Sequence, residues 1–253
     1  MFSDQKTAAS SSSGIFLCSR YAYPPNSLSL CGPLNKKKDM AYYSETAILD
    51  LGASEILGNF STLYPYLCLI AYQNNFSDPF DPLVVEAYWL GNQLLEKVRI
   101  KSYADHLIDK MELKKKSPGE LKRLVNFFPR SPKPHHSFHV LAVWRRTGHL
   151  NIPHTLETMD ACLINWGKII AFNEDGTIKV TTQKLEDVAG KLHLTKKITR
   201  NIKYQGKSDA LKSDLVKGDY LSYHWGYFCQ KLEVRQLINL KYYTNLSLQV
   251  INS

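Results

Sequence analysis

Apolar residues between positions 40 and 128 recur at the three- and four-residue spacing of amphipathic helices. One stretch, residues 61–73, is so apolar that we expect it to be buried, and the Asp81-Pro82 pair is typical of a helix start. We therefore predict an α-helical domain over residues 15–134. Its predicted helices cover 43–58, 61–73, the segment that begins at Asp81-Pro82, 101–116 and 118–128.

The pattern changes after residue 134. A connector rich in proline and histidine is predicted over residues 135–157, and beyond it apolar and polar positions alternate with the two-residue period of strands. The sequence Glu-Asp-Gly at 174–176 favours a hairpin turn, and residues 234–251 have an amphipathic helical pattern. We expect a small OB-like β-barrel with a C-terminal helix over residues 158–253, and so an α+β fold. The strand candidates are 138–144, 162–173, 177–182, 191–205 and 220–232.

The N-terminal segment carries neither pattern clearly. Residues 1–14 are rich in serine, which predicts a flexible tail. Proline restricts the backbone and lacks an N–H group, so Pro24-Pro25 predicts an extended or turn conformation, not a helix. The helical domain should therefore begin with a proline-rich arm.

Composition and charge narrow the class of protein. Apolar residues make up 44% of the chain and charged residues 22%, which excludes wholesale disorder and a coiled-coil rod. No apolar run reaches the eighteen or so residues of a membrane span, so we expect no contact with a membrane. Serines occupy the place of the apolar block of a signal peptide, and a cytoplasmic protein is therefore expected. The net charge of +9 fits acidic proteins and nucleic acid equally well.

The motifs of common enzyme classes are absent from the sequence. It has no glycine-rich phosphate loop, no HExxH zinc motif and no GxSxG nucleophile motif. Five scattered cysteines, an odd number, disfavour a disulfide framework and favour buried thiols or one functional thiol. A catalytic enzyme is therefore not the leading interpretation.

The C-terminal segment resembles a known family. From Met159 onward the order is a cysteine, a short strand reaching Gly-Lys-Ile-Ile (167–170), a hairpin, Val-Lys-Gly-Asp-Tyr (216–220), a strand with a central histidine, and a helix. This order resembles the HypC/HupF family of [NiFe]-hydrogenase maturation chaperones over about residues 156–253. Trp166 stands where that family has proline, and Cys162 lies deep in the chain, whereas the family's cysteine is the mature N-terminus.

The resemblance implies a function and a site. It implies that Cys162 and His224 handle an iron centre, Fe(CN)2(CO), with Gly167 and Trp225 as neighbouring cofactor-binding candidates. It also implies two partners, a hydrogenase large-subunit precursor and a HypD-type scaffold. Thiolate and imidazole suit a ferrous ion that must be released again. We therefore expect one metal ion to bridge the Cys162 sulfur and the His224 ring at a solvent-accessible edge of the barrel, with the two roughly 3–4.5 Å apart once metal is bound and several ångströms looser without it.

The whole chain also resembles an uncharacterised prokaryotic family with three short motifs. These are RYAYPPN-x-L-x-x-CGP (residues 20–33), EAYWLGN (86–92) and HW-x-x-x-C (224–229). The sequence also contains lesser site candidates, each of which has a packing role as its alternative. They are Cys18, Arg20, Asn26 and Cys31 in the first motif region, and His136 and His139, which with His135 form a possible ligand set.

Two other functions remain open. A small barrel with many tyrosines and a positive charge suits single-stranded nucleic acid, but the apolar alternation over 220–229 argues against an exposed tyrosine face. A thiol enzyme would use Cys162 or Cys31 with a nearby histidine as base, for instance His224, and would need a deep pocket beside them.

Overall fold

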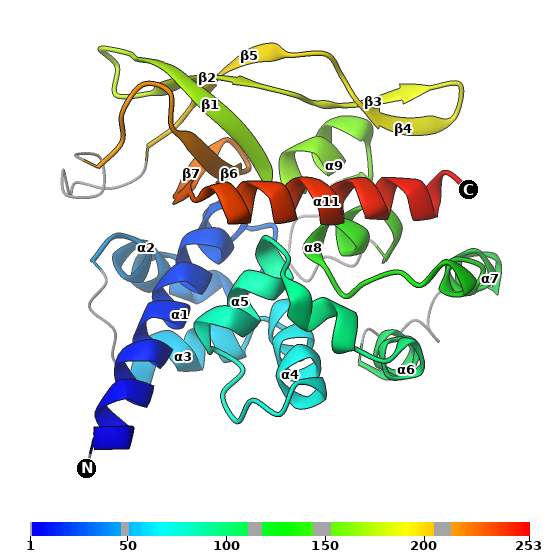
Figure 1. Cartoon of the computed structure of the whole chain (residues 1–253). Coiled ribbons are helices and arrows are strands. Elements are labelled where there is room, and N and C mark those ends of the chain that lie inside the picture. The colour runs from blue at the N-terminus through cyan, green and yellow to red at the C-terminus, as the bar shows by residue number, and fades with distance from the viewer. Residues whose placement is uncertain (1, 47–50, 111–117, 144–152, 205–213) are drawn as a thin grey trace.

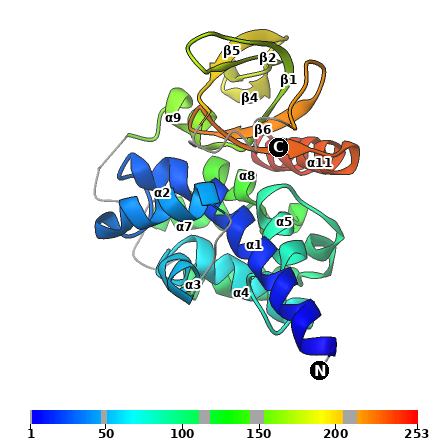
Figure 2. The same cartoon turned by 90° about the vertical axis from the view of Figure 1, so that its left-hand side faces the viewer.

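The computed structural model describes residues 2–46, 51–110, 118–143, 153–204 and 214–253. The fold is mixed α+β: one part of the molecule is helical, the strands form a separate layer, and the C-terminal helix α11 (Val234–Ile251) crosses between them (Figures 1 and 2). The first part contains α1 Phe2–Ser27, α2 Lys37–Thr46, α3 Leu51–Gly58, α4 Leu63–Gln73, α5 Pro82–Trp89, α6 Ile100–Asp109 and α7 Pro118–Val125, with 3-10 turns η1 Leu34–Lys36, η2 Gln93–Lys97 and η4 Phe128–Arg130.

Helix α1 corrects two predictions for the N-terminal segment. It runs without a break through residues 2–14, predicted as a flexible tail, and through Pro24 and Pro25, predicted to exclude a helix. Both prolines lie in its last turn, where they remove few intrahelical hydrogen bonds. Pro25 cannot donate to the carbonyl of Tyr21, and that carbonyl instead accepts a hydrogen bond of 2.8 Å from Nδ1 of His224. A contact distant in sequence thus replaces the local one.

The strands form a five-stranded antiparallel sheet in the order β5-β2-β1-β6-β7, and a separate β3–β4 hairpin. The predicted closed barrel is not observed among the described residues. In the described parts of the chain, the two edges of the sheet meet only at one isolated parallel bridge, between Lys203, which follows β5, and Tyr227 of β7. Two backbone hydrogen bonds, of 2.8 and 2.9 Å, make this contact, too few for a continuous ladder. The strands are β1 Asn165–Phe172, β2 Ile178–Thr182, β3 Leu185–Val188, β4 Lys191–Leu194, β5 Ile198–Ile202, β6 Tyr220–His224 and β7 Tyr227–Leu232.

The described residues of the region predicted as a connector are largely helical. Residues 136–143 form the short helix α8 (His136–Phe138) and the π-helical turn η5 (His139–Val143), so the strand predicted for 138–144 is wrong, while residue 144 lies outside the described residues. All eight residues are buried, and a short apolar run that is buried on all sides fits a helix as well as a strand. Helix α9 (Leu156–Cys162) follows.

Three further strand predictions need correction. The segment predicted as one strand over 191–205 is divided into β4 and β5, and residue 205 lies outside the described residues. The strand predicted from Cys162 begins at Asn165, because Cys162 is the last residue of α9. The segment 220–232 is not one strand but the hairpin β6–β7, which turns at Trp225 and Gly226. Gly167, a cofactor-binding candidate, pairs with Leu221 inside the sheet, and a Cβ there would lie 2.6 Å from a methyl group of Val180. Its observed role is close packing.

The helical part and the sheet share one hydrophobic core. The largest cluster of buried residues includes Tyr21 of α1, Tyr88 of α5, Trp166 of β1 and Leu240 of α11. The change of secondary structure near residue 135 therefore does not interrupt this core. Within the described residues, no helix is both long and apolar enough to span a bilayer.

An ion pair fixes α11 to α5 and gives a testable pH dependence. Arg235 donates two hydrogen bonds, of 2.6 and 2.9 Å, to the carboxylate of Glu86, and Gln236 donates a third. Burial raises the pKa of Glu86, but these donors outweigh burial and hold it below its ordinary value of 4.5. A carboxylate with a lowered pKa stabilises the fold above its unfolded pKa, and this stabilisation is lost as the pH falls through the folded value.

We expect Glu86→Gln to lower the free energy of unfolding by about 1–2 kcal/mol at neutral pH, since Arg235 is half exposed and keeps access to water. The difference from the wild type should shrink below pH 4.5. Urea unfolding at several pH values measures both effects. Glu55→Gln, at an exposed site on α3, is the control and should change stability little. An unchanged difference down to pH 3 would contradict the assignment.

Candidate metal centre

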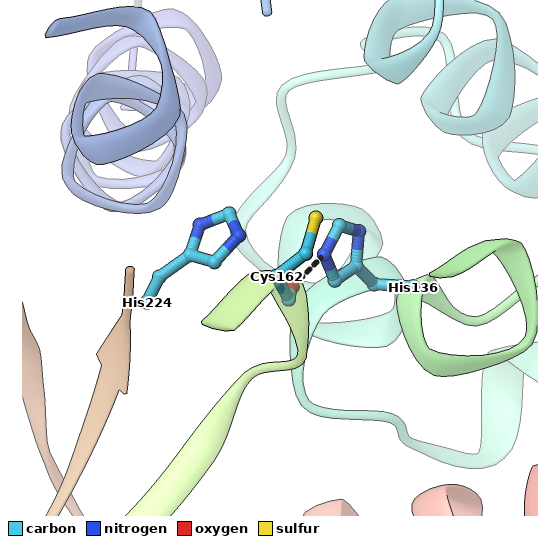
Figure 3. A group of neighbouring side chains, drawn as sticks. All are labelled: His136, Cys162 and His224. Carbon is cyan, nitrogen blue, oxygen red and sulfur yellow. Dashed lines mark hydrogen bonds between the residues drawn. The ribbon is translucent and has the colours of Figure 1, made fainter. Parts of the chain in front are cut away.

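Three side chains from three segments meet at one point of the core. His136 comes from α8, Cys162 from the end of α9 and His224 from the end of β6. Their potential ligand atoms, one from each residue, all lie within 4.8 Å of one another. Figure 3 shows Cys162 and His136 side by side, with His224 approaching from the strand opposite. The structure thus brings Cys162 and His224 together, as the sequence led us to expect, and adds His136 to them.

The β6–β7 turn positions His224. Trp225 and Gly226, which form the turn, have positive φ angles of 51° and 76°, as in the tight two-residue turns of hairpins. A bulky residue with positive φ is uncommon, and the backbone N–H of Trp225 donates a 2.8 Å hydrogen bond to the carbonyl of Ala161, beside Cys162. This bond ties the turn to the end of α9 and holds His224 next to the cysteine.

The tautomer of His224 follows from its backbone partner. A carbonyl oxygen can only accept a hydrogen bond. The proton of His224 is therefore on Nδ1, which donates to the backbone carbonyl of Tyr21, and Nε2 carries the lone pair. The hydroxyl of Tyr21 makes a second link to the same strand, at 2.7 Å from the hydroxyl of Ser222. A histidine whose Nδ1–H is fixed by a backbone carbonyl is the arrangement that metal-binding histidines commonly have.

His136 is held on both ring nitrogens. Nε2 lies 2.8 Å from the carbonyl oxygen of Cys162 and donates to it, and Nδ1 lies 3.2 Å from the hydroxyl of Tyr88. Tyrosine is both a donor and an acceptor, so it can serve either tautomer of His136. When the proton is on Nδ1, this N–H donates a hydrogen bond to the hydroxyl of Tyr88, and Nε2 carries the lone pair that can bind a metal. Burial, together with the nearby His224 and His139, lowers the pKa of His136 well below its ordinary value of 6.5, so this ring is neutral.

The surroundings of the three residues, called the His–Cys–His cluster below, are aromatic and buried. The ring of Trp89 lies 4.6 Å from that of His136 and 5.8 Å from that of His224, measured between centroids. His136 is 6% exposed, Cys162 7% and His224 1%. The cluster is therefore buried, and the predicted solvent-accessible edge is wrong. The reason is that Cys162 ends a helix packed inside the molecule and does not begin an edge strand.

The donor set defines the chemistry of the cluster. One thiolate and two neutral imidazoles are ligands for zinc and for ferrous, copper or other borderline metal ions, whereas magnesium and calcium prefer oxygen. Three protein ligands leave positions open for ligands that the metal brings with it. Because the ligands lie 26 and 62 residues apart in sequence, bound metal would link segments that are otherwise joined by packing and hydrogen bonds.

The remaining candidates divide by distance from the cluster. His139 follows one turn later and hydrogen-bonds Tyr66 at 3.1 Å, with its ring centroid 6.5 Å from that of His136. His135 is 2.6 Å from the hydroxyl of Ser137. Neither belongs to the three-residue cluster. Of the predicted histidine set, His136 alone belongs to the cluster.

The candidates from the first motif have structural partners. The side chain of Asn26 donates to the carbonyls of Cys31 and Pro33, both at 3.0 Å, and so shapes the turn after α1. Burial raises the pKa of the Cys18 thiol to about 12, which keeps it protonated. All five cysteines are described, and none forms a disulfide. Arg20 is buried and donates to the carbonyl of Cys229.

The sequence did not reveal several residues of the site. Tyr21, Tyr88 and Trp89, which contact the histidines, were absent from the predicted site, although each lies in one of the three motifs that the sequence analysis singled out. The three motifs converge here: RYAYPPN supplies Tyr21, EAYWLGN supplies Tyr88 and Trp89, and HW-x-x-x-C supplies His224. This convergence is the signal that could have placed the site.

Comparison with known proteins assigns a family. Residues 10–253 match the model of a family of unknown function, DUF6390. The chain belongs to this family. The match spans almost the whole DUF6390 chain, so a single family model covers both the helical part and the sheet. No curated protein and no solved structure is similar enough to match it.

Proposed function

We propose that this DUF6390 protein is an accessory factor of [NiFe]-hydrogenase maturation, which carries the Fe(CN)2(CO) centre to the large-subunit precursor in the cytoplasm. The observation that carries the proposal is the meeting of Cys162, His136 and His224 within 4.8 Å. A low-spin ferrous ion binds thiolate and imidazole well. Three protein donors, two cyanides and one carbonyl together would fill an octahedral ferrous site.

The resemblance of the C-terminal segment to HypC/HupF chaperones supports the choice of cargo. The cysteine and the strand histidine implied by that resemblance are two of the three residues of the cluster. The strand connectivity also supports it, since β1 pairs with β2 and β6 while the outer strands touch at Lys203 and Tyr227, as expected for a distorted OB-like barrel. Both points concern residues distant in sequence, which spacing alone does not bring together.

A carrier must also release its cargo, and His136 is suited to leave first. When the metal leaves, a proton shift from Nδ1 to Nε2 lets Nε2 donate to the carbonyl of Cys162, 2.8 Å away, while the hydroxyl of Tyr88 donates to Nδ1, so both ring nitrogens keep a partner. Cys162 and His224 would then hold the centre with one position open for the next protein. The β6–β7 turn is tied to α9 through the 2.8 Å bond from Trp225 to Ala161, and we expect the cluster to open there.

The test is recovery of the cargo and its partners from cells that produce a hydrogenase. Tagged wild-type protein is expected to co-purify with the large-subunit precursor or the HypD-type scaffold, and to show infrared bands of bound cyanide and carbonyl. Cys162→Ala should lose the bands and iron by about tenfold or more, because the thiolate is the anionic ligand. Cys68→Ala, which changes a thiol on α4 outside the cluster, is the matched control.

Absence of both partners and of the infrared bands, under conditions that recover the ordinary chaperone with its cargo, would contradict the proposed function. Equal bands in Cys162→Ala and in the wild type would contradict the assignment of the ligand.

A further inference from the structure

A pocket of about 430 Å³ lies between α1, the start of α5, β7 and α11. We call it the Arg20 pocket. Its apolar wall includes Phe16 and Leu17 of α1, Leu83 of α5 and Phe228 of β7. The volume falls in the range of sites for small organic ligands.

Arg20 brings a permanent positive charge to this pocket although it is only 6% exposed. Its Nε donates to the carbonyl of Cys229, and Nη1 lies 3.5 Å from the carbonyl of Ser44. The guanidinium also lies over the rings of Phe228 and Phe16, at 5.0 and 5.6 Å from their centroids. Among the described residues, no carboxylate lies within 4.0 Å of it, so its charge is met by carbonyl dipoles and aromatic faces alone.

The other charged groups of the pocket have counter-charges of their own. Glu86 is bound by Arg235, with 2.6 Å between nitrogen and oxygen, and Lys231 lies 2.7 Å from Asp219. The fourth charged group of the lining, Asp214, is exposed to solvent at the rim, where its backbone carbonyl accepts a hydrogen bond from Lys231. A buried cation without an anion is costly, and a guanidinium presents its N–H groups as a planar fork that suits a carboxylate. Arg20 is thus the buried charge that a ligand can neutralise.

We propose that the Arg20 pocket binds a small organic carboxylate, with the carboxylate on the guanidinium and an aliphatic or aromatic body against the apolar wall. The inference is independent of the metal chemistry, because none of His136, Cys162 and His224 lines the pocket. It assigns to Arg20 a binding role in addition to its bond to β7.

Isothermal titration calorimetry of the purified full chain, with octanoate as the probe, tests this inference. Octanamide has the same apolar body without the charge, and inorganic phosphate has charge without the body. We expect octanoate to bind at one site, and octanamide and phosphate to bind at least about tenfold more weakly. Equal binding of octanoate and octanamide, or no binding of octanoate, would overturn the proposal.

Two variants locate the binding. Arg20→Gln removes the charge and should weaken octanoate binding about 10- to 100-fold. Leu83→Trp fills the pocket from a half-exposed position and should weaken binding similarly while leaving Arg20 in place, so it decides the matter even if Arg20→Gln does not fold. Arg123→Gln, at an exposed position on α7, is the matched control and should bind as the wild type does. Unchanged binding in Leu83→Trp would place octanoate elsewhere and refute the proposal.

Discussion

Replacing Cys162 with serine is expected to weaken the binding of Zn²⁺, used as a probe, by about 100-fold or more. The thiolate is the anionic and the softest of the three donors, and the two imidazoles that remain are neutral. A serine hydroxyl keeps the size of the side chain but not its affinity for such metals. Competition with a chromophoric chelator measures the dissociation constant. His224→Ala should show a loss of the same order.

Two variants serve as controls for this result. Cys68→Ser removes a thiol outside the cluster, and His139→Ala removes the histidine one turn beyond His136. Both should bind Zn²⁺ as the wild type does. A wild-type protein that binds no more tightly than Cys162→Ser would show that the cluster is a packed arrangement of side chains without affinity for metal.

The second large effect expected is a rise in thermal stability on metal binding. A ligand that binds the folded state alone stabilises it by about 4 kcal/mol when its free concentration is a thousand times the dissociation constant. For a chain of this length each kcal/mol raises the unfolding temperature by about 2–4 °C, so a shift of roughly 8–16 °C is expected. The ligands belong to α8, α9 and β6, and unfolding must separate them.

Differential scanning calorimetry with Zn²⁺, and with Mg²⁺ in its place, measures this effect. The oxygen-preferring Mg²⁺ should leave the unfolding temperature unchanged. The His136→Ala variant should lose most of the shift with Zn²⁺, since two ligands bind much more weakly than three. A shift that is equal in His136→Ala and in the wild type would mean that Zn²⁺ binds elsewhere on the chain.

The sequence predicted the helical part better than the sheet. The signals of a helix lie within the helix itself, whereas a strand also depends on the segments that pair with it, which can be far away in the sequence. The stretch 61–73 forms α4 within the core, and the Asp81-Pro82 pair starts α5, with the carboxylate of Asp81 accepting from the N–H of Leu83. These signals are local. The end of α1 depends on a distant residue instead. Pro25 is tolerated there because the carbonyl of Tyr21 accepts a hydrogen bond from His224, 203 residues further along the chain.

The site was half predictable for a related reason. Cys162 and His224 were found through a family resemblance, which carries information about residues that meet in space. His136 stood out only as one of three clustered histidines. Its selection over His139 depends on the turn from α8 into the π-helical η5, which directs the two rings to different partners, Tyr88 and Tyr66. No sequence pattern in the run of buried residues 136–143 specifies that turn.

The ligands of a bound metal can be read directly from extended X-ray absorption fine structure of the Zn²⁺-loaded protein. We expect a first shell with one sulfur at about 2.3 Å and two imidazole nitrogens at about 2.0 Å, completed by a light ligand from the solvent. The sulfur contribution should vanish in Cys162→Ser and remain in Cys68→Ser. A wild-type spectrum with only nitrogen and oxygen neighbours would contradict metal binding by His136, Cys162 and His224.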